Sequence, residues 1–167
     1  MKNLWAPWRY AWIKESSRGV DNCFICDALQ ESGDQDRKNL VLHRGKSCLV
    51  IMNRYPYSNG HVMIAPKRHI ADPRQIKPEE WLETGELTQI VLEALARTIS
   101  PHGFNLGWNI GQIAGAGLEQ HLHQHIVPRW EGDTNYLPVL GKTKVISQDL
   151  WECYDLLAKT FKELLNT

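Results

Sequence analysis

Apolar positions form five short runs bounded by turn-forming residues, and each run has the length and composition of a β-strand. Gly45 and Lys46 separate the first two runs, which is typical of a tight hairpin turn. A glycine-rich loop, residues 111–117, separates the last two. The predicted strands span residues 40–44, 47–53, 61–66, 104–110 and 120–128.

Two longer segments place apolar side chains at helical spacing. The first begins at Pro78, carries Glu79 and Glu80 in its first turn, and is predicted to run to about residue 100. The second is predicted over residues 148–165, whereas the polar stretch 31–39 is predicted to be a loop. Because short loops join most of the strands and the helices are separate from them in sequence, we expect an α+β fold with an antiparallel sheet.

Composition narrows the class of protein. The chain of 167 residues and 19.2 kDa is 43% hydrophobic and 23% charged, which is typical of one globular domain over residues 1–167. Nineteen basic and nineteen acidic residues cancel, so a general basic surface for duplex nucleic acid is not expected. No apolar run reaches the roughly 18 residues of a membrane span and no signal-peptide pattern is present, so we expect a cytoplasmic protein without membrane contact.

Both ends of the chain differ from the middle. We expect an aromatic N-terminal arm over residues 1–20 and a C-terminal helical extension over residues 145–167. The arm contains Trp5, Trp8 and Trp12, a cluster that is not expected to remain in water. These rings either pack on the domain or a partner subunit, or stack on a planar ligand such as a purine, and the sequence leaves both alternatives open.

Three histidines alternate at the start of the last predicted strand. His121, His123 and His125 are spaced by two, which places their side chains on one face of a strand. Three imidazoles are costly in a core and unusual on a bare surface. Their pattern indicates either metal ligation or phosphate chemistry by a histidine nucleophile with acid–base support.

A C-x-x-C pair supplies half of a tetrahedral metal site. Cys23 and Cys26 need two further ligands, which His69 and one of the alternating histidines could provide. The alternative is a thioredoxin-like redox pair, which needs a preceding strand and a βαβ context that the sequence does not indicate. Cys48 and Cys153 lie in apolar surroundings, and we expect both to be small buried side chains.

Longer segments extend the histidine pattern. HLHQHIVP, residues 121–128, follows the motif H-φ-H-φ-H-φ-φ, and the flanking matches are LWAPWRYAWI, YPYSNGHVMIAPKRH, PHGFNLGWNIG and PRWEGDTNYLPVLGKTKVI. On these residues the chain resembles the histidine triad (HIT) family of nucleotide hydrolases and transferases, and most closely its branch of bacterial-type diadenosine tetraphosphate phosphorylases and hydrolases. Gln124 stands where the motif has an apolar residue, and we expect it to point away from the histidines.

The resemblance implies roles for the polar residues. It implies that His123 is the nucleophile that attacks the α-phosphate, and that His125 and His61 flank it and share protons and phosphate oxygens. His61 is expected at a loop–strand junction near the edge of the sheet. Asn53 matches a position that binds the ribose hydroxyls, and Asn109 matches an amide at the phosphate or the leaving group.

The same resemblance implies a role for the glycine-rich loop and a set of ligands for a metal ion. Gly115 and Gly117 would bring backbone N–H groups close to phosphate. Leu118 stands where related phosphorylases have a hydroxyl residue, which puts recognition of the second-substrate phosphate in question. A structural Zn²⁺ is implied, with no organic cofactor. Its implied ligands are Cys23, Cys26, His69 and His121.

The resemblance implies that the protein cleaves a dinucleoside polyphosphate through a nucleotidyl intermediate on His123, with diadenosine tetraphosphate as the first candidate substrate. Inorganic phosphate as acceptor gives a phosphorylase that forms ATP and ADP, and water gives a hydrolase. The alternatives are a nucleoside phosphoramidase and a non-catalytic protein that binds purine nucleotides. The resemblance also implies a homodimer, with the sheet extended across it.

Overall fold

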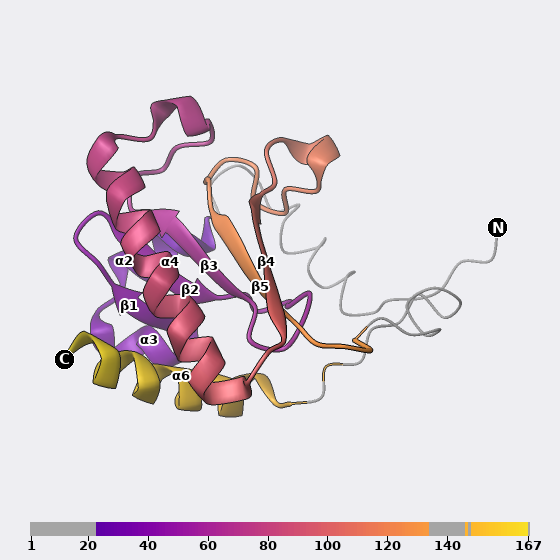
Figure 1. Ribbon diagram of the computed structural model, residues 1–167. Helices are drawn as coiled ribbons and strands as arrows, with labels where there is room; N and C mark the ends of the chain where they lie inside the picture. The colour runs from indigo at the N-terminus through magenta and orange to yellow at the C-terminus, as the bar shows by residue number, and fades with distance from the viewer. Residues whose placement is uncertain (1–22, 134–145, 147, 167) are drawn as a thin grey trace.

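The computed structural model describes residues 23–133, 146 and 148–166, and its centre is one antiparallel sheet (Figure 1). The strand order is β1-β2-β3-β5-β4. This architecture confirms the predicted α+β class and all five predicted strands, with ends that shift by a few residues. The strands are β1 (Val41–Arg44), β2 (Cys48–Met52), β3 (Val62–Pro66), β4 (Gly103–Trp108) and β5 (Gln124–Arg129).

Strands β2 and β3 lie inside the sheet, and every residue of both is buried. Continuous apolar runs suit this position because both faces of each strand are covered. Cys48 and Cys153 are fully buried, as expected. The described residues include no helix that is long and apolar enough to cross a membrane.

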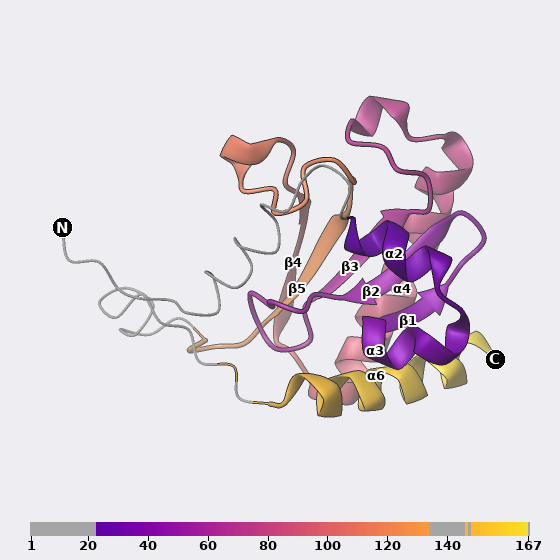
Figure 2. The same ribbon diagram turned by 180° about the vertical axis from the view of Figure 1, so that it is seen from behind.

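Helix α4 (Pro78–Ile99) packs against β2, β3 and β5, and Figures 1 and 2 show it on one face of the sheet with α2 (Phe24–Gln30) on the other. It begins with proline at its first turn, and the Glu80 side chain accepts the backbone N–H of Lys77 at 2.9 Å. Its C-cap, Ser100, has a left-handed backbone. The predicted helix over residues 78–100 is confirmed.

Helix α6 (Leu150–Leu165) packs against α4 and β1. It begins two residues after the predicted start because Asp149 caps it, accepting hydrogen bonds from the N–H groups of Trp151 and Glu152. The helical C-terminal segment is therefore present within the predicted residues 145–167. The aromatic arm, residues 1–20, lies outside the described residues.

The predicted loop over residues 31–39 is wrong. It contains the 3₁₀ turn η1 (Gly33–Gln35) and the short helix α3 (Asp36–Asn39). Leu40 follows the last residue of α3 as its C-cap, where a φ of 62° reverses the chain, and its side chain is buried in the core. The polarity of the segment hid this turn, because α3 has no buried residue of its own. Two further 3₁₀ turns, η2 (Pro73–Gln75) and η3 (Gln112–Ala114), lie in loops.

Candidate histidine and metal site

Adjacent strands bring two of the predicted histidines together. His61 directly precedes β3, and His125 lies on β5, which pairs with β3 at Met63. The Nε2 atom of His61 is 2.9 Å from Nδ1 of His125, and both side chains are buried. The expectation that His61 lies near the edge of the sheet is wrong, because β3 is the central strand.

Hydrogen bonds define the tautomer of His61. Its Nδ1 accepts the backbone N–H of Tyr57 at 3.1 Å and lies 3.3 Å from the amide nitrogen of Asn53. The Asn53 carbonyl oxygen accepts the N–H of Tyr55, which fixes the amide orientation. Because Nδ1 of His61 is an acceptor, its ring hydrogen is on Nε2 and is donated to Nδ1 of His125.

The order of donor and acceptor in these hydrogen bonds also fixes the tautomer of His125. With Nδ1 as acceptor, its hydrogen is on Nε2. The side-chain amide nitrogen of Asn109, just after β4, lies 3.3 Å from this Nε2, and the amide accepts the Nε2–H only when its oxygen is turned toward His125. Burial first, and then the neighbouring His123, lower the pKa of His125 to about 4. The imidazole of His125 is therefore neutral at pH 7.

His123 has a different partner. Its Nδ1 donates to the backbone carbonyl of His121 at 2.7 Å, which leaves Nε2 as the ring nitrogen that carries a lone pair. Its ring lies edge-on to that of His125, with 4.7 Å between centroids. Burial lowers the pKa of His123, against the opposing effect of the carbonyl hydrogen bond. A neutral, oriented imidazole of this kind can act as a nucleophile.

The three alternating histidines do not share one strand, so that prediction is wrong. Strand β5 begins only at Gln124, and its side chain accepts a hydrogen bond from Thr88 on α4, on the face away from His125, as expected. The register of β3 with β5 would place Pro66 opposite Leu122. Proline has no N–H for the ladder, so the pairing stops there.

Beyond that point His121 turns toward the C-x-x-C segment. Cys23 caps the start of α2, with Cys26 one turn later. The Nδ1 of His121 is 3.1 Å from Sγ of Cys23 and 3.5 Å from Sγ of Cys26, and Nδ1 of His69 is 3.1 Å from Sγ of Cys26. The possible ligand atoms of these four residues all lie within 4.8 Å of one another.

This donor set fits a zinc ion. Two thiols and two imidazoles are a common tetrahedral set for a closed, structural site. The Nε2–H of His121 donates to the carbonyl of Pro66 at 2.8 Å, which directs Nδ1 into the cluster, as is usual for metal-bound histidine. Burial raises the pKa of the Cys23 thiol to about 12, so that thiol needs a cation beside it to ionise at neutral pH.

Comparison with known proteins identifies the family of this chain. Residues 34–132 match the HIT domain family model, and over 162 residues the chain is 35% identical to a protein of Mycobacterium tuberculosis named AP-4-A phosphorylase. That alignment covers 95% of this chain and 83% of the relative. The chain belongs to the HIT domain family.

Solved structures of HIT proteins have the same fold. A hypothetical histidine triad nucleotide-binding protein of Sulfolobus tokodaii matches with a TM-score of 0.64 and 26% identity, over 86% of this chain and 92% of that one. A histidine triad family protein of Mycobacterium smegmatis, described as zinc-bound, matches with a TM-score of 0.67 and 22% identity, over 89% of this chain and 99% of that one. The α+β HIT fold is thereby confirmed.

Tyr57 is part of this HIT site but was absent from the sequence-based predictions. Its ring centroid is 4.7 Å from that of His61 and 5.5 Å from that of His125. Its hydroxyl oxygen is 3.5 Å from the amide nitrogen of Asn109. The only sequence signal is its position four residues before His61, in the segment YPYSNGH.

For the glycine-rich loop, residues 111–117, the structure gives backbone conformation and exposure rather than contacts with the histidines. Gly111 and Gly115 have positive φ, and the N–H of Gly115 closes the η3 turn on the carbonyl of Gln112. Gly117 is exposed, and Leu118 is half-buried against the hydrophobic core. Their role at phosphate remains a prediction.

Proposed function

We propose that this HIT protein cleaves diadenosine tetraphosphate through a nucleotidyl intermediate on His123. The observation that carries the proposal is the 2.7 Å hydrogen bond from Nδ1 of His123 to the His121 carbonyl, which orients a neutral ring with its lone pair on Nε2. Membership of the HIT family and the similarity to an AP-4-A phosphorylase support a nucleotide-processing enzyme.

In the first step Nε2 of His123 bonds to the α-phosphorus, and the bond from phosphorus to the bridging oxygen breaks, which releases ATP. Positive charge develops on the imidazole as the N–P bond forms. The carbonyl of His121 accepts the Nδ1–H of that ring and stabilises this charge. Burial disfavours the charged form of His123 before the reaction, so the lone pair on its Nε2 stays available.

In the second step an oxygen of the acceptor attacks the same phosphorus and the N–P bond breaks, which restores neutral His123. Phosphate as acceptor yields ADP, and water yields AMP. We propose that the Nε2–H of His125, oriented through His61 and Tyr57, donates to a phosphate oxygen during both steps. Asn53 and Asn109 are proposed to bind the ribose hydroxyls and the phosphate or leaving group.

We propose that the cluster of Cys23, Cys26, His69 and His121 holds a structural Zn²⁺. When bound there, the ion would cross-link α2 to the segments that carry the two histidines. The side chain of His121 faces this cluster while its carbonyl orients His123. The metal site and the proposed nucleophile therefore share one residue.

Product analysis tests the reaction. Diadenosine tetraphosphate is incubated with the protein, with and without inorganic phosphate, and the nucleotides are separated by chromatography. ADP and ATP formed only with phosphate identify a phosphorylase, and AMP and ATP formed in both samples identify a hydrolase. No cleavage in either sample overturns the proposal.

Replacement of the nucleophile tests the intermediate. We expect His123→Ala to lower turnover by roughly a thousandfold or more while nucleotide binding changes little, because only the covalent step is lost. His102→Ala is the control, since His102 is exposed and its Nδ1 accepts the N–H of Glu131, remote from the site. Turnover that survives His123→Ala would assign the attack to another group.

A further inference from the structure

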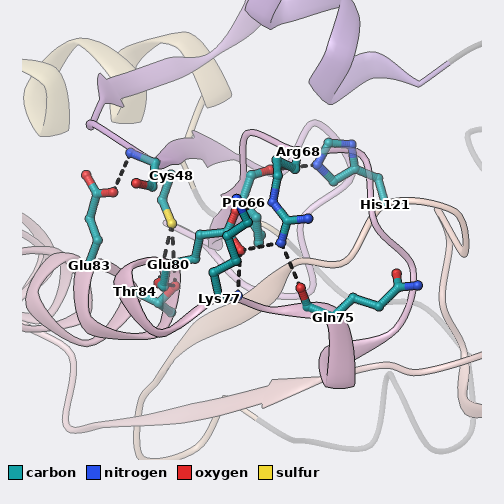
Figure 3. Close-up of polar contacts among 10 residues, drawn as sticks. Cys48, Pro66, Arg68, Gln75, Lys77, Glu80, Glu83, Thr84 and His121 are labelled. Carbon is teal, nitrogen blue, oxygen red and sulfur yellow. Dashed lines mark hydrogen bonds and ion pairs between the residues drawn. The ribbon is translucent and has the colours of Figure 1, made fainter.

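An ion pair joins the loop after β3 to the first turn of α4 (Figure 3). Arg68 directs Nε and Nη2 at the two carboxylate oxygens of Glu80, each at 2.7 Å. The same Nη2 donates to the carbonyl of Gln75 at 2.7 Å, and the N–H of Lys77 donates to Glu80 at 2.9 Å. The Glu80 side chain is only 4% exposed, so this pair is largely removed from water on one side.

The loop segment beside this pair, residues 66–70, binds the side chain of His121 and the main chain of Leu122. Its first carbonyl, from Pro66, accepts the Nε2–H of His121 at 2.8 Å, which Figure 3 also shows. Its last carbonyl, from Ile70, accepts the N–H of Leu122 at 2.6 Å. The two ends of this five-residue segment therefore hold residues 121 and 122, and Arg68 lies at its centre.

The same segment reaches the metal cluster and the proposed nucleophile. It carries His69, whose Nδ1 is 3.1 Å from Sγ of Cys26. It also orients His121, whose carbonyl accepts the Nδ1–H of His123 at 2.7 Å. Displacement of the segment would move one cluster ligand directly and would reach His123 through His121.

Residues 67–72 belong to no helix or strand, so individual contacts hold this loop, among them the hydrogen bond from the N–H of Lys67 to the carbonyl of Ser47 at 2.8 Å. A bidentate guanidinium–carboxylate pair fixes direction as well as distance, which a single hydrogen bond does not. A buried carboxylate is costly unless it is paired, so such a pair is weak evidence for added stability. Its position between the helix and the cluster ligands indicates a role in geometry.

We propose that Arg68 and Glu80 are positioning residues, which fix the 66–70 segment so that His69 and His121 meet the two cysteines and His123 keeps its orientation. Neither side chain is assigned a contact with metal or substrate. The inference rests on the proposed zinc site and on the proposed role of His123, and it adds to them the residues that set their geometry.

Zinc affinity of the full-length protein tests this inference directly, by competition with a chromophoric chelator. We expect Arg68→Met to weaken zinc binding roughly 10- to 100-fold, as outer-shell replacements do. Arg68→Lys should recover part of the loss, since lysine keeps the charge but not the bidentate geometry. Glu80→Gln should fall between wild type and Arg68→Met, because glutamine still caps the helix but removes the charge.

Arg129→Met is the matched control. Arg129 also forms a bidentate pair with a mostly buried carboxylate, that of Asp133, but at the far end of β5. We expect this variant to retain wild-type zinc affinity even where its unfolding temperature falls. Equal zinc affinity of Arg68→Met and Arg129→Met would overturn the positioning role.

The kinetic readout separates this inference from the proposed function. With diadenosine tetraphosphate, Arg68→Met should lower kcat on the order of tenfold and change KM little, because the nucleophile is misaligned while the binding residues stay. Failure of the wild type to take up zinc would overturn the metal site and this inference together. Zinc uptake by the wild type without diadenosine tetraphosphate cleavage would overturn the proposed reaction, and a zinc loss confined to the Arg68 and Glu80 variants would still support the positioning role.

Discussion

His125 stays uncharged because of what surrounds it. Its ring is 7% exposed, lies against His61 and His123, and accepts the hydrogen of His61 through Nδ1. Burial, followed by repulsion from His123, lowers its pKa from 6.5 to about 4. A proton on Nδ1 would also cost the hydrogen bond from His61.

This depressed pKa predicts a loss of stability in acid. The unfolded chain takes up a proton at His125 near pH 6.5, and the folded chain only near pH 4. The free energy that the neutral, buried imidazole contributes to folding is therefore fully present above pH 6.5 and is lost as the pH falls toward 4. Between about pH 7.5 and about pH 5, the free energy of unfolding should fall by roughly 2 kcal/mol more in wild type than in His125→Gln. Urea unfolding at the two pH values measures this difference, and an equal fall in both proteins would contradict it.

The identity of the site histidines could be predicted, but not their partners. Spacing and resemblance selected His61, His123 and His125, and the structure brings all three into one cluster. The carbonyl that orients His123 and the N–H that orients His61 are backbone groups, which carry no side-chain signal. Tyr57 was missed because its N–H carries no side-chain signal and because the contacts of its ring with His61 and His125 depend on how the loop folds.

A buried polar contact anchors helix α6 to the sheet. The hydroxyl of Tyr154 donates to the carbonyl of Val41 at 2.8 Å, and both residues are buried. We expect Tyr154→Phe to lower the free energy of unfolding by about 1–2 kcal/mol, because the Val41 carbonyl loses this partner. Chemical denaturation measures the change.

Thr160→Ala on the same helix is the control. Its hydroxyl bonds only within exposed or half-buried parts of the surface, to Leu156 and Thr98, so its loss should cost about 0.5 kcal/mol or less. An equal cost for both variants would show that the Tyr154 hydroxyl has no special role in docking α6.

Elements with regular apolar spacing were predictable, and the breaks between them were less so. Helix α4 agrees with its predicted bounds because proline, acidic residues and apolar spacing coincide there. The histidine strand was predicted to begin at residue 120 but begins at Gln124. The cause is Pro66 on the neighbouring strand, and the pairing of β3 with β5 could not be read from either segment alone.

At the scale of the molecule, strand order produces the site. β5 lies between β3 and β4, although it follows both in sequence, and this order places His125 between His61 and Asn109. The same order leaves β4 at one end of the sheet, where it pairs with β5 on one side and no other described strand on the other. Open edges of this kind favour pairing with another chain.

Large apolar side chains lie beside that edge. Trp108 of β4 contacts Trp81 of α4 edge-on at 5.8 Å between centroids, and Trp81 is 47% exposed. Leu106 of β4 is 44% exposed. An unpaired edge with exposed large apolar side chains is typical of an interface, so we expect the predicted homodimer to form here, with the two sheets joined at β4.

Leu106→Lys tests this interface, because a lysine on an edge strand opposes pairing of two copies. Sedimentation should give twice 19.2 kDa for wild type and 19.2 kDa for the variant at the same concentration. Leu156→Lys is the control, since Leu156 has the same 44% exposure but lies on α6. A wild-type protein of 19.2 kDa would contradict the dimer, and a dimeric Leu106→Lys variant would place its interface elsewhere.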